Sequence, residues 1–423
     1  MKRFAAGLEC IHLYQNSFLQ MALSVSDKKY IHPLINQIQQ RCLGLRVKAK
    51  EFELFSGQKT PDPISIPLSI TDLKEATTWM KENQGLNSQV SLGSIGFNDH
   101  LIVLNLCHNM CDGRFMASLA SELSNENSKN ISPIEGCPIE PSSYFSKEVS
   151  LNNKECKVCG NDPQIARYKT KGIYQPTPKY TESYWYRFPM KELACFDSKS
   201  QKAVKLLEHQ IAAVSLAAAS MNSDKEYYNV GASCPVDIRR FTPMTPYEPL
   251  NSIDSEIVKK YSFANFIAST SAYTKAKSSE KIVDILPRIR NCMNDKIRSG
   301  EHFKFLHTMQ KIVEAGGIQG EFPDGAGIEV SSIGPVNIGG RINDYLFSHV
   351  INGEQSSKSI EFVTYSLRTP TNYDFSGYLN YMPGDATTEE ARKLLKCFEF
   401  SLKNIDDSTT VGDAIQLLRK NVL

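Results

Sequence analysis

The segment Leu104–Leu123, "LNLCHNMCDGRFMASLASEL", joins two kinds of hydrophobic pattern. Leu101 to Leu106 form a continuous apolar run, which predicts a buried strand. After Asp112 and Gly113, apolar residues recur at intervals of three and four, which predicts a helix that ends near Leu123. The sequence therefore predicts a strand, a short turn and a helix. The turn collects four reactive residues, Cys107, His108, Cys111 and Asp112.

A metal site in this turn is the first possibility. Successive residues of a strand point to opposite faces of a sheet, so Cys107 and His108 diverge. The tight spacing therefore disfavours joint coordination by the four residues. We expect no metal here.

A second possible metal site is the "CKVC" pair, Cys156 and Cys159. Its spacing matches half of a zinc site, but no second pair completes the tetrahedral set. We expect two loop thiols, and the alternative is a zinc knuckle completed by Cys137 or Cys195.

A thiol nucleophile is the next possibility. Cys111 precedes a helix, whose N-terminus can stabilise a thiolate. Cysteine is also among the most frequently buried residue types, so we expect Cys107 and Cys111 to be packing residues.

A general base is the third possibility. His108 follows a buried strand, and the ends of strands expose side chains to clefts. A neutral imidazole that titrates near pH 7 suits general-base catalysis. The same residues also fit a hydrogen-bonded core histidine followed by an N-cap aspartate, and the pattern alone leaves both interpretations open.

The flanking segments predict an α/β protein. Ile31 to Cys42 have helical spacing that Gly44 ends, and a strand follows. Val90–Phe97 and Leu101–Leu106 predict a hairpin, because the intervening "NDH" contains turn formers. The opening "GLECIHLYQNSFLQMALSV" shows strand-like alternation in places.

The second half continues this pattern. Residues 124–178 are rich in Asn, Ser, Pro and Gly and predict a long surface connection, so we divide the chain into domains 1–175 and 176–423. Residues 194–221 predict two helices with a short connection. A strand-rich stretch follows, and a closing amphipathic helix has Thr388 and Glu390 in its first turn.

The composition argues against several classes of protein. The 423 residues carry 48 basic and 46 acidic side chains, for a net charge of +2 without single-sign blocks, which gives no support to nucleic-acid binding. The longest apolar run is too short to span a bilayer, and Glu9 and His12 interrupt the place of a signal peptide. Eleven scattered cysteines suit reduced thiols. We expect a cytoplasmic protein without a transmembrane segment.

The segment that contains His108 resembles the HxxxDG motif of the chloramphenicol acetyltransferase-like superfamily. This superfamily includes alcohol acetyltransferases, BAHD acyltransferases, polyketide-associated acyltransferases and nonribosomal peptide condensation domains. Other segments are similar in the same order along the chain. They are "LINQIQQRCLGLRVKA", "NVGASCPVDIRRFTP", "VSSIGPV" and "SGYLNYMPG".

The resemblance implies two α/β subdomains with mixed sheets and a channel between them that His108 reaches. It implies acyl transfer from acyl-coenzyme A, as co-substrate, to a small alcohol or amine, with His108 as base and without a permanently bound cofactor or metal. We expect a monomer.

The resemblance also assigns roles around the base. It implies that Asp112 orients the turn by pairing with an arginine, for which Arg239 is the first choice and Arg240 the second. Gly113 leaves room for the backbone beside the channel. Ser331 and Ser332 are candidate donors to the oxyanion, and they equally fit ordinary strand serines.

The sequence differs from two branches of this superfamily in their characteristic motifs. Condensation domains usually carry two adjacent histidines, and Cys107 takes the first place here. "DFSGY", Asp374 to Tyr378, shares only two residues with the BAHD signature "DFGWG". These features favour an alcohol acetyltransferase-like enzyme. The alternatives are a carrier-protein-dependent condensation or transacylation domain, and a non-catalytic binding protein of the same fold.

Overall fold

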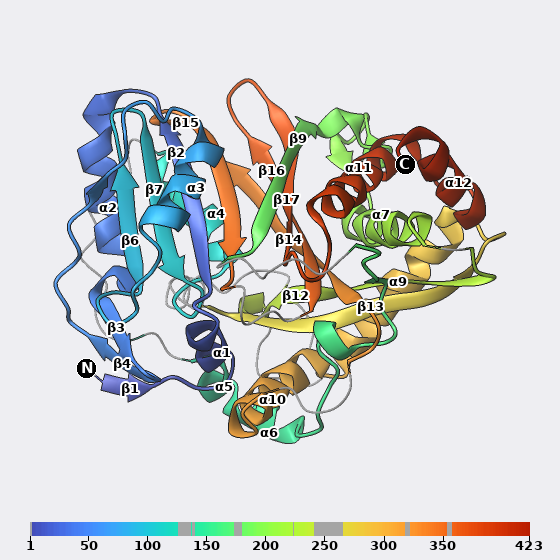
Figure 1. Ribbon diagram of the computed structural model, residues 1–423, viewed down its shortest axis with the longest axis horizontal. Coiled ribbons are helices and arrows are strands. Elements are labelled where there is room, and N and C mark those ends of the chain that lie inside the picture. Colours follow the sequence, from blue (N-terminus) through green and yellow to red (C-terminus); the bar gives the residue numbers. More distant parts are fainter. Residues whose placement is uncertain are drawn as a thin grey trace.

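The computed structural model describes residues 2–125, 137, 140–172, 180–222, 224–240, 265–317, 322–352 and 358–423. Within them the chain forms two main β-sheets that lie side by side, each with its own helices (Figure 1). This is the expected architecture of two α/β halves with mixed sheets. The boundary proposed between residues 175 and 176 falls outside the described residues.

The first main sheet has five strands around β7. In sheet order they are β15 (Ile342–Val350), β2 (Phe18–Val25), β7 (Leu101–Cys107), β6 (Gly93–Phe97) and β5 (Ile64–Ser65). β6 and β7 form the predicted antiparallel hairpin. Helix α3 (Leu73–Asn83) packs on one face of this sheet, and α2 (Ile31–Arg41) and α4 (Gly113–Leu123) pack on the other. β7 is consequently buried on both faces, which explains its continuous apolar sequence.

Strand β15 comes from the far end of the chain but pairs with β2. Its residues lie next to the strands of the second sheet in sequence, between β14 (Ala326–Asn337) and β16 (Ser359–Arg368). The first sheet is therefore completed by a segment of the C-terminal half, and Figure 1 shows this strand beside β2.

The second main sheet is mixed. Its order is β13 (Ile267–Lys277), β12 (Tyr227–Asp237), β14, β16, β17 (Tyr373–Tyr381) and β9 (Glu182–Pro189), and β8 (Arg167–Tyr168) also pairs with β14. Four helices supply the apolar cluster on one face: α7 (Leu206–Ser220), α9 (Ile282–Arg298), α11 (Thr388–Asn404) and α12 (Val411–Asn421). The opposite face looks toward the first half.

Smaller elements complete the molecule. The additional strands are β1 (Lys2–Phe4), β4 (Glu53–Ser56) and β3 (Val47–Lys50), which form a small sheet, and β10 (Phe196–Asp197) and β11 (Lys202–Ala203), which form a hairpin. The additional helices are α1 (Leu8–Tyr14), α5 (Pro141–Tyr144), α6 (Ser146–Leu151) and α10 (Glu301–Glu314). α1 packs on α10 below the gap between the sheets.

Two expectations about secondary structure were wrong. The opening segment begins with helix α1, which the sequence did not reveal because this helix has no side-chain N-cap. A residue far along the chain holds its start instead, because the Gly7 amide donates a hydrogen bond to Gln310 Oε1 at 2.8 Å. Strand β2 then follows as the alternation suggested.

The second error concerns residues 194–221, which contain one helix and not two. The first part folds as the β10–β11 hairpin. Asp197 accepts hydrogen bonds from the amides of Lys199 and Ser200, and this local bonding competes with a helix. Only α7 remains, and it is buried nearly all round, which explains its alanine-rich sequence.

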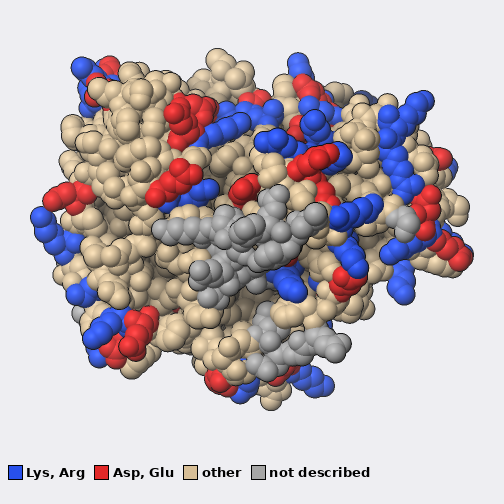
Figure 2. All heavy atoms as spheres, in the orientation of Figure 1, with Lys and Arg blue, Asp and Glu red and all other residues tan. Residues whose placement is uncertain are grey.

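Charged side chains of both signs are interspersed over the face in Figure 2. This mixing agrees with the net charge of +2. A search of the described residues finds no helix with both the length and the apolar character needed to cross a bilayer.

Candidate active site

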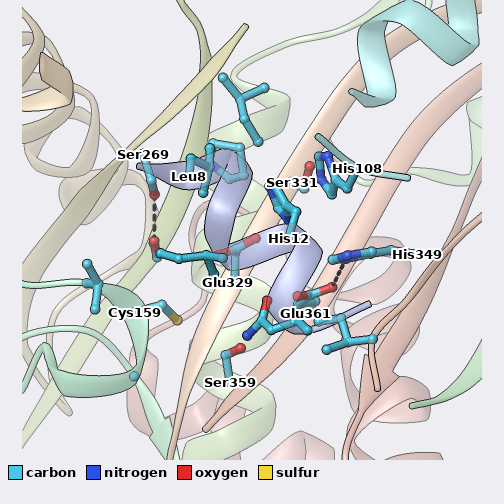
Figure 3. Close-up of a pocket in the computed structure, with 18 of the residues that line it drawn as sticks. Leu8, His12, His108, Cys159, Ser269, Glu329, Ser331, His349, Ser359 and Glu361 are labelled. Carbon is cyan, nitrogen blue, oxygen red and sulfur yellow. Dashed lines mark hydrogen bonds and ion pairs between the residues drawn. The ribbon is translucent and has the colours of Figure 1, made fainter. Parts of the chain in front are cut away.

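A cavity of about 520 Å³ lies between the two sheets. Both halves contribute to its walls, and apolar side chains dominate them. The polar residues that line it include His12, His108, Ser233, Glu329, Ser331, His349 and Glu361 (Figure 3).

His108 follows the last residue of β7 and lies in the wall of this cavity. Its backbone amide donates to Ser17 O at 2.9 Å, which ties the turn to the start of β2. Its Nδ1 lies 2.9 Å from the carbonyl oxygen of Cys111. A carbonyl oxygen can only accept, so Nδ1 carries the hydrogen and Nε2 keeps the free lone pair. The turn therefore sets the tautomer that a general base needs.

Two other imidazoles touch His108. The His12 ring stacks on it with 4.1 Å between centroids, and the His349 ring meets it edge to face at 5.0 Å. Burial, with a smaller contribution from the charge of His349, lowers the pKa of His108 to about 4. The ring is consequently neutral at pH 7, in the form that can accept a proton.

Asp112 does not face the cavity. It is fully buried, and it caps α4 because Oδ1 accepts from the Phe115 amide at 2.9 Å. Its Oδ2 accepts from Arg239 Nη2 at 2.7 Å and from the Phe266 amide at 2.9 Å. One carboxylate thus fixes the helix start, the segment after β12 and the start of β13.

The structure brings Arg239, and not Arg240, to Asp112. Arg239 is buried and also binds Asp237 at 3.0 Å, whereas the exposed Arg240 lies 3.8 Å from Asp237. Burial opposes the charge of Arg239, but the two aspartates outweigh this effect and raise the pKa of its guanidinium above the ordinary value. The buried guanidinium of Arg239 therefore keeps its charge.

Gly113 is the first residue of α4 and lines the cavity. A Cβ atom at this position would lie 2.9 Å from Cγ1 of Ile333 in β14. Close packing of α4 on β14 is therefore one reason for glycine here, and the expected role of leaving room beside the channel stays a prediction.

Ser331 and Ser332 lie in β14 and point in opposite directions. Ser331 lines the cavity near His108, and Ser332 is exposed. A break in strand register follows Ser332. Of the two oxyanion candidates, Ser331 lies in the cavity wall, and its role as a donor stays a prediction.

The cysteines have packing roles at the turn. Cys107 and Cys111 are buried in different apolar clusters, and burial raises the pKa of both thiols, so neither is a thiolate at pH 7. All eleven cysteines lie in described residues and are free thiols. Cys159 lines the cavity, but the described part of the chain holds no group of three side chains suited to a metal ion.

Sequence reasoning missed a second polar unit beside His108. His349 of β15 contacts Glu361 of β16, with 3.0 Å between Nδ1 and Oε2, and its Nε2 lies 2.8 Å from Ser17 Oγ. Burial favours the neutral form of Glu361, but the charge and hydrogen bond of His349 prevail and lower its pKa.

Glu329 of β14 was missed too. Burial, followed by the charge of Glu361, raises its pKa to about 8. The sequence did contain a signal for Glu329 and Glu361, because each glutamate stands within an apolar strand segment, "GIEVSS" and "SIEFVTYS". Glutamate is seldom buried unless it is paired. No spacing rule connects these strands to His108.

Comparisons with known proteins identify the fold. No family model and no curated protein matches the sequence. Among solved structures, polyketide synthase associated protein 5 from Mycobacterium tuberculosis matches with a TM-score of 0.59 and 12% identity, over 95% of this chain and 98% of that one.

Two condensation domains are similar as well. A variant of the starter condensation domain of rhizomide synthetase RzmA, in complex with C8-CoA, gives a TM-score of 0.62 and 11% identity over 97% and 96% of the chains. The first condensation domain of the calcium-dependent antibiotic synthetase, with a substrate analogue, gives 0.61 and 12% over 98% of both chains. The chain has the chloramphenicol acetyltransferase-like fold.

This finding confirms the expected fold class. In the chloramphenicol acetyltransferase-like fold of this chain, the HxxxDG turn lies between the sheets at the cavity wall. The neighbours reported above are condensation domains and a polyketide synthase associated protein. The expected likeness to alcohol acetyltransferases stays a prediction.

Proposed function

We propose that the protein is an acyltransferase that moves an acyl group from a thioester to a hydroxyl or amino group. The observation that carries this proposal is the state of His108. Its ring is neutral, its Nδ1–H is held by the Cys111 carbonyl, and its Nε2 lone pair is left for a ligand in the cavity.

In the proposed reaction, His108 Nε2 first accepts a proton and later returns it. His108 Nε2 takes the proton of the acceptor as its oxygen or nitrogen attacks the thioester carbon. The resulting tetrahedral oxyanion collapses, the carbon–sulfur bond breaks, and the imidazolium returns the proton to the leaving thiolate. No acyl group is attached to the protein in this scheme.

Other residues support this step. Ser331 is a candidate donor to the oxyanion, since it lines the cavity near His108. Asp112 and Arg239 are proposed as positioning residues, because they hold the turn that supplies the Cys111 carbonyl.

The thioester donor is proposed to be acyl-coenzyme A or an acyl group on a carrier protein. One similar structure was solved with C8-CoA, and likeness to condensation domains supports condensation or transacylation more than alcohol acetylation. Parallel assays with free acyl-CoA and with the same acyl group on a carrier protein separate the two donors.

The test of the function is thiol release. Purified protein is incubated with a panel of acyl-CoA donors and small alcohols or amines, and free coenzyme A is measured by chromatography. His108→Ala should reduce turnover by roughly 10² to 10⁴-fold. His100→Ala, a histidine in an exposed hairpin turn, is the matched control and should keep full activity. Unchanged turnover in His108→Ala would exclude the mechanism, and thioester binding without turnover in the unaltered protein would indicate a binding protein.

A further inference from the structure

A row of polar residues crosses the second sheet at the level of the cavity. Strand register places them side by side on one face: Ser271, Ser233, Glu329, Glu361, Asn380 and Ser183. Their sequence neighbours on the opposite face belong to the apolar cluster around α7. The row therefore faces the first half of the chain, and its central members line the cavity.

Nearly every member of this row has a partner within the protein. Ser271 donates to Asp162 at 2.7 Å, and Ser233 pairs with Ser269 at 2.9 Å. Asn380 Nδ2 donates to Glu361 at 3.2 Å, and Ser183 donates to Asn380 Oδ1 at 3.1 Å. Glu329 is the exception, since its carboxyl group has no hydrogen bond or ion pair to any described residue. It faces the cavity (Figure 3).

Ionising Glu329 is costly without a ligand. It lies in direct register with Glu361, and neighbouring strands are only about 4.8 Å apart. If both carboxyl groups were ionised, like charges on paired strands would destabilise the sheet. His349 is already engaged with Glu361, and the described residues that line the cavity include neither lysine nor arginine. No described residue of the cavity lining therefore supplies a cation to Glu329.

His12 provides an independent sign that the cavity takes a polar ligand. This ring is only 7% exposed, lines the same cavity, and neither nitrogen has a hydrogen-bond partner among the described residues. Burial lowers its pKa well below the ordinary value, so it is a neutral acceptor or donor. An unpartnered buried imidazole costs free energy that a hydrogen-bonding ligand would recover.

We propose that the acyl acceptor carries a protonated amine, which Glu329 binds beside Glu361 while a hydroxyl or second amino group of the same molecule reaches His108. This inference rests on the proposed acyl transfer and names its acceptor class, an amino alcohol or a diamine. The arrangement favours two groups in one small molecule, because the His349 ring contacts both His108 and Glu361, and Glu361 is paired with Glu329 in strand register.

Protonation links this binding to pH. The titratable groups around Glu329 are Glu361 from β16, His349 from β15, Tyr378 from β17, and the thiols of Cys159 and Cys234. With a pKa near 8, the free carboxyl group is neutral at pH 7. A bound ammonium favours the carboxylate, so binding should release a proton.

The test is titration calorimetry with two probes of equal length, 6-amino-1-hexanol and 1,6-hexanediol. The unaltered protein should bind the amino alcohol about tenfold tighter or more, as expected for a partly desolvated charge pair. In buffers of different ionisation enthalpy at pH 7, the amino alcohol should release up to one proton. Glu329→Gln should abolish both the preference and the proton release. If Glu329→Gln does not fold, Glu329→Ala replaces it in the same measurements. Glu75→Gln, on the exposed face of α3, should change neither.

The outcomes separate this inference from the proposed function. Equal affinity for the two probes, or a preference that survives in Glu329→Gln, would overturn the inference. His108→Ala should retain the preference, because His108 is not the site of the charge. A protein that shows the preference but transfers no acyl group from any thioester would contradict the proposed function and leave the cation site supported.

Discussion

Asp112 Oδ2 lies 2.7 Å from Nη2 of Arg239, a residue 127 positions further along the chain. This single contact joins the turn that carries His108 to the segment after β12. The turn that carries His108, the proposed base, is therefore held by both halves of the molecule.

The first prediction concerns this pair. Asp112→Asn keeps an oxygen for the Phe115 amide but removes the carboxylate charge that lies 2.7 Å from the buried Arg239 guanidinium. We expect a loss of about 3 kcal/mol in the free energy of unfolding, which denaturant titration would measure. Asp324→Asn breaks the exposed pair with Lys169 and should cause no measurable loss. Equal stability of Asp112→Asn and the unaltered protein would remove the orienting role.

The second prediction concerns the pH dependence of turnover. Because burial lowers the pKa of His108 to about 4, the base stays neutral well below pH 6.5. The value of kcat/KM, which reports the free enzyme, should show no loss from protonation of His108 between pH 8 and about 5, and should fall toward pH 4. A base with an ordinary histidine pKa would produce a break near 6.5 instead. The profile of His100→Ala should match that of the unaltered protein.

The third prediction concerns Gly113. A Cβ at this position would meet the Ile333 side chain at 2.9 Å, so Gly113→Ala should destabilise the protein by about 1 to 3 kcal/mol through overpacking. Ile333→Ala removes the opposing atoms. The double variant should therefore recover part of the loss, and a double-mutant cycle of unfolding free energies measures that coupling. Strictly additive effects would contradict the contact.

The fourth prediction concerns thermal stability. The pKa of Glu329 is about 8 in the folded protein, compared with an ordinary value of 4.5, so the folded state binds this proton more tightly than the unfolded state. The resulting stabilisation is complete below about pH 4.5 and is lost as pH rises toward 8. Glu329→Gln does not titrate, so its Tm advantage over the unaltered protein should grow from pH 5 to 8 and then level off. A constant difference across this range would indicate an unshifted pKa.

The sequence predicted the local parts of the site. The β6–β7 hairpin, the start of α4 and the turn that carries His108 all followed from hydrophobic period and turn chemistry. The resemblance added the pairing of Asp112 with Arg239. Each of these conclusions depends on residues that are close in sequence or on a shared motif.

The long-range parts of the site had no such signal. His12 lies on a helix without a side-chain N-cap, and its stacking on His108 depends on how α1 packs against α10. Glu329 and Glu361 lie side by side only because β14 and β16 are paired in one register. Strand order and register are set by the whole fold, and no window of sequence contains them.

Strand β15 has a consequence for any attempt to divide this protein. Without residues 342–350, β2 would become an open sheet edge with unpaired backbone groups, which invites aggregation. A fragment that ends before β15 would also lack His349 and Glu361 of β16, which contacts it. A fragment ending before β15 should therefore be both insoluble and inactive, whereas a circular permutant that keeps β15 next to β2 should fold.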